Sequence, residues 1–445
     1  MTIVELFDVR PINNAVGLLS FNPDKIIYVG GDSKKHFYGR TLPVLNAFLE
    51  HKKLDVPVIE YVNVKRNSLK DIVDNLEKIY KDNADCRFHV EVTGGEDLVL
   101  VALGVMFARH PEIQMYRINS KLTNLFSFSW DNDDGEKLDV TVSNSVEDNL
   151  VLHGASIVSS NGDETVTGGF DYSAEFLSDL NKMWTILCEG TGKGQSAPNS
   201  WNRVCYTLSK LTSEYAAKTG VNAFEINENG LSTLFYTSSS EDMFNSYIDA
   251  FSKNGWLVWT KKDNGAVVVF KNDQIRACLT KSGLVLELKT YLICSKLFKE
   301  RGGDCLTGVT IDWDGEDDVS AKDKFLSDPE DSDSTIDTIN EVDVVANLGL
   351  VPYFISCKNG GMNSDELYKL YSIGQRFGSG YARLLIVTTD ISFALGDSEN
   401  LFRQRALDMG IDILSNVHTV SDDELTDALR KILDLQKIKK PSILN

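Results

Sequence analysis

Short, almost continuous hydrophobic runs alternate with segments of helical periodicity over the first 120 residues. The runs predict strands, and helical spacing fills the segments between them. The predicted strands cover residues 2–7, 25–29, 56–62, 87–92 and 113–118, and the predicted helices cover 14–19, 41–52, 68–81 and 96–109. Strands without polar alternation are typical of a parallel sheet covered by helices on both faces. We therefore predict an α/β, doubly wound sheet that binds ligands at the carboxyl ends of its strands.

The hydrophobic pattern is less regular between residues 151 and 280. Three helical segments are followed by two short strands around Lys261–Gly265, which predict a hairpin. Helices followed by a hairpin resemble a winged helix, but a plain spacer explains the same pattern. The hairpin predicted at 122–142, around a turn at 131–135, completes the part of the chain before this region.

From residue 281 onwards the predicted order is helix, strand, strand, strand, helix, strand, followed by two more helices. These elements cover residues 282–297, 306–312, 341–346, 353–358, 364–377, 383–389, 399–409 and 423–435. A length of 445 residues suggests about three domains. We place their boundaries at 1–150, 151–280 and 281–445.

Composition excludes several classes of protein. Seven scattered cysteines without a Cys-x-x-Cys pair argue against a disulfide framework and a zinc site. No hydrophobic run reaches the roughly 20 residues of a membrane span, and the N-terminus lacks a signal-peptide pattern. We expect a cytoplasmic protein without a membrane partner. The net charge of −20 argues against a nucleic-acid partner. Residues 304–343 alone hold fourteen acids and two lysines, however, so the rest of the chain is only mildly acidic.

The chemistry with the clearest pattern lies in two adjacent predicted strands. Asp343 is on the first strand, and Lys358 ends the second. Alternation along a strand directs Ser356 and Lys358 to one face, and Glu341 and Asp343 also share a face. A carboxylate can bind Mg²⁺ or Mn²⁺ beside a phosphate, and the lysine adds a positive charge. Ordinary charges on a surface strand pair explain the same spacing.

Glu287 strengthens the interpretation of a site. The predicted helix from Ser282 has a hydrophobic stripe formed by Leu284, Leu288, Tyr291 and Leu292, and Glu287 lies within it. An unpaired carboxylate there would be costly, so a cation partner is expected. That partner is either a metal ion held jointly with Asp343 or a neighbouring lysine.

The element order, with an acid on the second strand and a lysine ending the third, resembles the PD-(D/E)XK nuclease fold. More narrowly, Gly308–Gly315, Asn340–Asp343 and Phe354–Gly360 resemble the CARF-domain nucleases of type III CRISPR systems. Val92–Gly95 is similar to the nucleotide-binding loop of the Rossmann-like CARF domain. The resemblance covers roughly residues 1–150 and 281–390.

The resemblance implies roles for individual residues. Asp343 corresponds to the metal-binding acid, Lys358 to the catalytic lysine and Glu287 to an additional acid on a helix. Ser356 departs from the motif, in which a carboxylate usually stands two positions before the lysine. Glu287 or Glu341 would then complete the metal shell.

The resemblance also implies a homodimer that binds one cyclic tetra-adenylate across its two-fold axis. Backbone N–H groups at the glycine-rich turn suit phosphates. Lys34 and Lys35 could neutralise phosphates, but the same two residues can equally be exposed loop lysines. The residues that we expect to contact this ligand are Arg10, Asn13, Gly30, Gly31, Ser33, Lys35, Thr93, Gly94, Gly95 and Glu96.

These observations predict a cyclic tetra-adenylate-activated endonuclease that requires Mg²⁺ or Mn²⁺ and cuts single-stranded DNA or RNA, or plasmid DNA. The alternative is a non-catalytic CARF regulator that binds DNA and has a degenerate nuclease domain. Ser356 favours that alternative, whereas the Asp343–Lys358 pair and Glu287 favour the enzyme.

Overall fold

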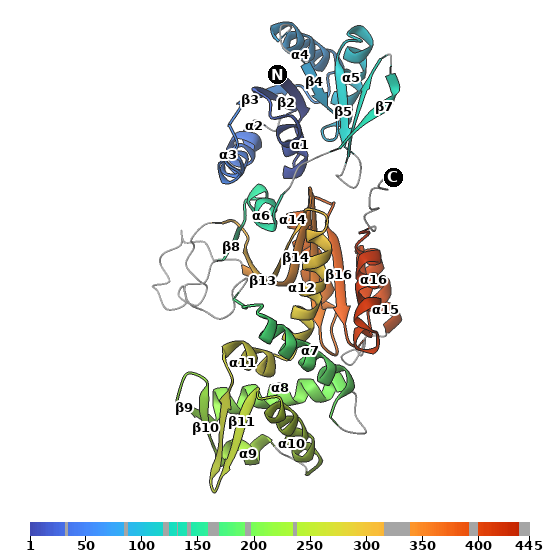
Figure 1. Cartoon of the computed structure of the whole chain (residues 1–445). Coiled ribbons are helices and arrows are strands. Elements are labelled where there is room, and N and C mark those ends of the chain that lie inside the picture. Colours follow the sequence, from blue (N-terminus) through green and yellow to red (C-terminus); the bar gives the residue numbers. More distant parts are fainter. Residues whose placement is uncertain are drawn as a thin grey trace, which may run out of the picture.

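The structure is a computed structural model (Figure 1). It describes residues 1–31, 34–83, 88–118, 124–130, 132–139, 144–158, 169–191, 197–234, 238–315, 339–390 and 399–435. The predicted α/β fold class is confirmed, because helices alternate with strands that form three separate sheets. Within the described residues, no helix is both long and apolar enough to cross a membrane.

The N-terminal unit is built on a seven-stranded sheet with the order β3-β2-β1-β4-β5-β6-β7. The first five strands are parallel, and β6 and β7 add the antiparallel hairpin. The strands are β1 (Thr2–Leu6), β2 (Lys25–Gly31), β3 (Val58–Val64), β4 (Phe88–Glu91), β5 (Gln114–Ile118), β6 (Asn124–Ser129) and β7 (Asn132–Asp139). The predicted turn at 131–135 is therefore too long, since β7 already begins at Asn132.

Helices surround this sheet on both faces, as predicted. They are α1 (Pro11–Phe21), α2 (Lys34–His36), η1 (Phe37–Thr41), α3 (Leu42–His51), α4 (Leu69–Asp82) and α5 (Asp97–Arg109). Helices α4 and α5 cover one face, where Ile72, Leu76 and Leu103 pack against Val4 and Val90. The opposite face packs against α1 and α3.

Two buried carboxylates lie side by side in the centre of this sheet. Glu5 on β1 and Glu91 on β4 are register partners, and their exposures are 0% and 2%. Glu5 accepts a hydrogen bond from the Gly17 N–H at 2.7 Å, and Glu91 accepts one from the Thr93 N–H at 2.8 Å. In the described part of the chain, one oxygen of each carboxylate has no hydrogen-bond partner. Burial raises the pKa of Glu91 to about 7, and burial together with Glu91 raises the pKa of Glu5.

The middle unit contains helices packed against a small antiparallel sheet with the order β11-β12-β10-β9. Its predicted helices and hairpin are present, joined by elements that the pattern did not predict. The elements are α7 (Ala174–Glu189), α8 (Ala197–Glu214), β9 (Ala216–Lys218), β10 (Ala223–Asn227), α9 (Glu228–Leu234), α10 (Ser238–Lys253), β11 (Leu257–Lys262), β12 (Gly265–Phe270) and α11 (Asp273–Thr280). The order from α8 to β12 has the succession of helices and a hairpin expected of a winged helix.

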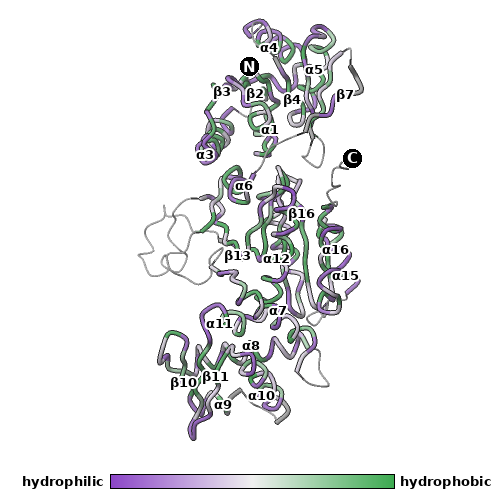
Figure 2. Tube along the Cα trace, in the orientation of Figure 1, coloured by the Kyte–Doolittle hydropathy of each residue, from purple (hydrophilic) through white to green (hydrophobic). Residues whose placement is uncertain are grey.

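The C-terminal unit is built on a six-stranded sheet with the order β17-β16-β15-β14-β13-β8. Its strands are β8 (Ser156–Ile157), β13 (Asp304–Asp312), β14 (Ile339–Leu348), β15 (Val351–Lys358), β16 (Arg383–Thr388) and β17 (Ile411–Leu414). Its helices are α6 (Val146–Leu152), α12 (Leu284–Lys299), α14 (Asp365–Gly378), α15 (Glu399–Asp408) and α16 (Asp422–Ile432), with the short η2 (Val417–Thr419). Hydrophobic residues, green in Figure 2, follow the strands of this sheet.

Strand β8 connects distant parts of the chain. Ile157 pairs with Ile311 and Ser156 with Asp312, so a segment that precedes the middle unit forms the edge of the C-terminal sheet. The division at 150 and 280 remains a prediction, and the strand pairing assigns 156–157 to the sheet of the third predicted domain. Leu150 of α6 also lies in the hydrophobic core shared by α14 and α15.

The order of the units in space differs from their order along the chain. In Figure 1 the C-terminal unit lies between the N-terminal unit and the middle unit. Direct contacts join the N-terminal and C-terminal units: Lys52 pairs with Asp148 at 2.9 Å, and the Tyr381 hydroxyl donates to Asn13 Oδ1 at 3.2 Å. The middle unit therefore does not lie between the other two units in space.

The buried carboxylates generate a prediction about pH. The pKa of Glu91 is near 7 in the folded protein and near its ordinary value of 4.5 in the unfolded chain, so the folded state binds more protons between these values. Stability should therefore fall as the pH rises from 5 to 8. E91Q removes the titrating group. Between pH 5 and pH 8 the free energy of unfolding of E91Q should therefore fall by about 2–3 kcal/mol less than that of wild type, and its thermal midpoint should fall less as well.

The control is E60Q, which removes an exposed carboxylate from the neighbouring part of the same sheet. Thermal midpoints of wild type, E91Q and E60Q are measured between pH 5 and pH 8. Equal pH dependence for E91Q and wild type would contradict the assignment of a raised pKa to Glu91.

Candidate functional site

A cavity of about 330 Å³ opens between the C-terminal sheet, the start of α12 and the end of the middle unit. Glu287, Glu341, Asp343 and Lys358 all line it, so the structure brings together the predicted acids and the predicted lysine. Other walls come from Phe170, Ala277, Lys281, Ser282, Gly283, Leu284, Thr307, Gly308, Cys357, Asn359 and Gly361. The charged side chains therefore face one shared space.

Asp343 is held in place by the strand next to it. Antiparallel pairing of β14 with β15 places Val344 opposite Ile355, which brings Asp343 beside Ser356. The Cys357 N–H donates to Asp343 Oδ2 at 2.5 Å, and the Ser356 hydroxyl lies 3.2 Å from the same oxygen. Ser356 is buried and supports Asp343. Ser356 stands where the motif usually has an acid, and its hydroxyl instead orients the acid on the neighbouring strand.

Glu287 is brought to the same cavity by the first turn of α12. Burial raises its pKa to about 8, and the neighbouring Asp343 adds to this effect. The Thr307 hydroxyl on β13 lies 3.0 Å from Glu287 Oε1 and 3.1 Å from the backbone oxygen of Asp343. The carboxyl group within the hydrophobic stripe therefore faces a second acid, whose negative charge adds to burial in favouring the protonated form of Glu287.

Lys358 lies between two carboxylates. Its Nζ is 3.1 Å from Glu366 Oε2 and 4.0 Å from Asp343 Oδ2. Burial lowers the pKa of Lys358, but Asp343 and Glu366 outweigh this effect and hold the pKa above its usual value. The lysine is therefore positively charged at neutral pH.

The donor set fits a hard divalent cation. Within the described ranges, no group of three His, Cys, Asp or Glu side chains is arranged to hold a metal ion. Mg²⁺ commonly takes one or two carboxylates and completes its shell with water and substrate phosphates. Asp343 and Glu287 would supply such a pair, and a cation between them would offset the burial and the charge of Asp343 that together raise the pKa of Glu287.

The predicted ligand residues of the N-terminal unit lie at the carboxyl ends of β1, β2 and β4. Gly94 packs so closely that a Cβ atom would lie 2.9 Å from Asp8 Cβ. Gly95 has a φ of +98°, and a Cβ atom there would meet Leu6 Cβ at 2.3 Å. Thr93 is fixed by its N–H bond to Glu91. The glycine-rich turn is thus tightly held against β1.

The other predicted ligand residues range from buried to exposed. Gly30 packs against Tyr61, Gly31 packs against Arg66, and the Arg66 guanidinium pairs with Glu96 at 3.1 Å. Arg10 is exposed at the start of α1. Asn13 is buried, and its amide donates to Asp8 at 3.0 Å and accepts from Tyr381. Ser33 lies outside the described residues.

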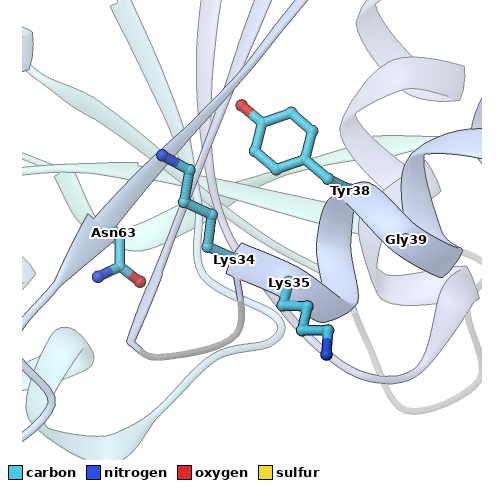
Figure 3. A pocket seen from close by; sticks show the side chains of 5 residues that line it. All are labelled: Lys34, Lys35, Tyr38, Gly39 and Asn63. Atoms are coloured by element: carbon cyan, nitrogen blue, oxygen red, sulfur yellow. The ribbon is translucent and has the colours of Figure 1, made fainter.

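A wider cavity of about 720 Å³ lies at the same edge of the sheet (Figure 3). Lys34, Lys35, Tyr38 and Gly39 contribute one wall, and Asn63, near the end of β3, contributes another. Figure 3 shows Lys34 and Tyr38 extending in the same direction, and Lys34 Nζ lies 6.0 Å from the centre of the Tyr38 ring. An aromatic ring, an amide and two lysines suit a ligand that carries bases and phosphates.

Sequence reasoning missed several residues of both sites. Tyr38 and Asn63 are marked only by lining one cavity with Lys34. Arg66 is marked only by its contacts with Gly31 and Glu96. Glu366 belongs to an Asn-Ser-Asp-Glu stretch typical of a helix start, and this local explanation concealed its contact with Lys358. Thr307 gave no signal, since threonine is common in strands.

The fold of this mixed α/β chain matches two solved proteins over almost its whole length. Protein VC1899 from Vibrio cholerae aligns with a TM-score of 0.67 and 15% identity, covering 98% of this chain and 97% of that one. Can2 from Sulfobacillus thermosulfidooxidans, solved in complex with cyclic tetra-adenylate, aligns with a TM-score of 0.64 and 15% identity, covering 97% of each chain. No protein-family profile and no curated sequence matches the chain.

The link between Thr307 and the two acids can be tested through stability. T307V keeps the side-chain shape but removes the hydroxyl, leaving the buried Glu287 carboxylate without this bond. The free energy of unfolding should fall by about 1–3 kcal/mol. T310V, on the same strand, is the matched control. Denaturant unfolding of both variants provides the measurement, and equal stability of T307V and wild type would rule out the role of this hydroxyl.

Proposed function

We propose that the chain is a metal-dependent nuclease that cleaves DNA or RNA phosphodiester bonds when its N-terminal CARF domain binds cyclic tetra-adenylate. The observation that carries this proposal is the convergence of Asp343, Glu287 and Lys358 on one cavity, in a sheet whose order of elements resembles that of the PD-(D/E)XK fold. The shared fold with a cyclic tetra-adenylate complex supports the sensor half. We assign the chain to the ancillary effectors of type III CRISPR defence on this basis.

Each side chain of the cavity has a distinct role in the proposed reaction. Lys358 is positively charged and stabilises the negative charge that develops on the phosphate in the transition state. Glu366 orients the lysine from one side, and Ser356 with the Cys357 N–H orients Asp343 from the other. Mg²⁺ or Mn²⁺ held by Asp343 and Glu287, with Glu341 at the rim, would supply Lewis-acid polarisation of the phosphate.

For the activator, we propose the edge formed by β1, β2, β3 and β4. Lys34, Lys35 and Tyr38 would contact phosphates and bases, and the Thr93–Glu96 turn would approach the ligand through its backbone. A cyclic ligand with repeated identical nucleotides suits two copies of this edge related by a two-fold axis, so a homodimer is part of the proposal. Activation would then follow from a difference in ligand affinity between two arrangements of the dimer.

The rival function is a non-catalytic regulator with a degenerate nuclease site. Ser356 favours it, because one carboxylate of the motif is missing from β15. The hairpin of the middle unit gives little support for contact with nucleic acid, because its lysines have acidic partners. Lys262 pairs with Glu225, and Lys261 is within 4.0 Å of Glu241. These pairings reduce the positive charge available for phosphates.

The nuclease assignment predicts that D343A and K358A each lower cleavage at least about 100-fold, because D343A removes a proposed metal ligand and K358A removes the positive charge that acts on the phosphate. Labelled single-stranded RNA, single-stranded DNA and plasmid are incubated with Mn²⁺, with and without cyclic tetra-adenylate. Binding of the activator should be unchanged in both variants. Full activity in both would refute the site, and no cleavage by wild type under any condition would favour the regulator.

The sensor assignment predicts that Y38A and K34A weaken the binding of cyclic tetra-adenylate by about 10-fold or more, since stacking and charge neutralisation are both lost. Isothermal titration with the activator measures the effect. Y206A, which removes an exposed tyrosine from the middle unit, is the control. Unchanged affinity in both variants would exclude this edge as the activator site.

A further inference from the structure

The residue that directly follows Lys358 contacts the middle unit. Asn359 directly follows β15, and Asn202 lies in α8, 157 positions earlier. The Asn359 Nδ2 donates to Asn202 Oδ1 at 2.7 Å, and the Asn202 Nδ2 donates in return to the backbone oxygen of Asn359. Each asparagine thus gives and receives a hydrogen bond. The two units are joined beside the lysine.

Asn359 also ties the strand of Lys358 to the helix of Glu287. Its Nδ2 donates to the Ser282 backbone oxygen at 3.2 Å, just before α12 begins at Leu284. Its Oδ1 accepts from the Thr389 hydroxyl at 2.7 Å, at the end of β16. One side chain therefore links α8, α12, β15 and β16.

The backbone next to Asn359 allows this close approach. Gly360 has a φ of +111°, a region that favours glycine, and a Cβ atom there would lie 2.8 Å from Asn202 Nδ2. Any other residue at this position would strain the turn and press against α8. Ala277 and Lys281, at the end of the middle unit, line the same cavity as Lys358.

We propose that the Asn202–Asn359 pair makes the middle unit a positioning element of the nuclease site, which sets the place of Lys358 relative to Glu287. This inference rests on the proposed nuclease function. The lysine reaches the cavity on a flexible side chain, so a shift of its backbone displaces the ammonium group. A displacement of about 1 Å can reduce a rate about 100-fold. Asn202 itself need not touch the substrate.

The test uses the full-length protein with Mn²⁺ and cyclic tetra-adenylate. N202A should lower kcat for cleavage about 10- to 100-fold while changing KM less than about 3-fold, because positioning is lost and binding groups remain. N202D is a second variant: it keeps an acceptor for the Asn359 amide but turns an oxygen toward the Asn359 carbonyl. It should lower kcat in the same way. N254A is the control, since the Asn254 amide in the middle unit donates to the backbone oxygen of Ala250, in the last turns of the adjoining α10.

The double variant N202A/N359A separates a shared contact from two independent effects. If both residues act through one contact, the double variant should be no slower than N359A alone. Independent effects would multiply, and a multiplied loss would overturn the proposal. Hydrogen–deuterium exchange of residues 355–361 gives a readout without catalysis. Exchange there should accelerate in N202A and stay at the wild-type rate in N254A.

The outcomes distinguish failure of this inference from failure of the proposed function. If K358A is inactive while N202A retains wild-type kcat and exchange, the positioning role is wrong and the nuclease site stands. If wild type cleaves nothing, the nuclease function is wrong, and the exchange measurement alone decides whether Asn202 holds the segment. Unchanged exchange in both Asn202 variants would overturn the positioning role in either case.

Discussion

The antiparallel pairing of β14 with β15 is the interaction on which the C-terminal sheet and its cavity both depend. The register that places Val344 opposite Ile355 brings Asp343 to the strand that ends in Lys358. On its other side, β15 pairs in parallel with β16, so it is buried in the middle of the sheet. Because side chains alternate along a strand, a shift by one residue would turn Asp343 away from the cavity. The hydrophobic core on both faces of the sheet therefore also preserves the arrangement of the charged groups.

Regular patterns explain which parts could be predicted from the sequence. The strands of the C-terminal sheet and α12 have hydrophobic periods long enough to be recognised, and Glu287 stood out because it interrupts one of them. Strand β8 has two residues and no period, and its partner β13 lies about 150 positions later. Glu366 and Asn202 are polar residues on helices, where polar residues are ordinary. Their roles arise from contacts across 8 and 157 positions, which no local pattern records.

The spatial order of the units gives the N-terminal edge a short route to the C-terminal sheet. Asp8, at the end of β1, accepts from Asn13, and Asn13 accepts from Tyr381, which precedes β16. Lys52 and Asp148 form a second connection, through α3 and α6. The middle unit does not lie on either route. It contacts the opposite end of the same sheet, next to Asn359.

The position of β8 has a consequence for how the middle unit can move. The chain leaves the C-terminal sheet after β8, forms the middle unit and returns through α12, so the unit is an insertion anchored at both ends to one sheet. A unit attached at two points has fewer ways to move than one attached by a single linker. A fragment that starts at residue 281 would lack β8 and leave the edge of β13 open to pairing with other chains. The sheet of the third predicted domain thus takes one edge strand from a segment before residue 281.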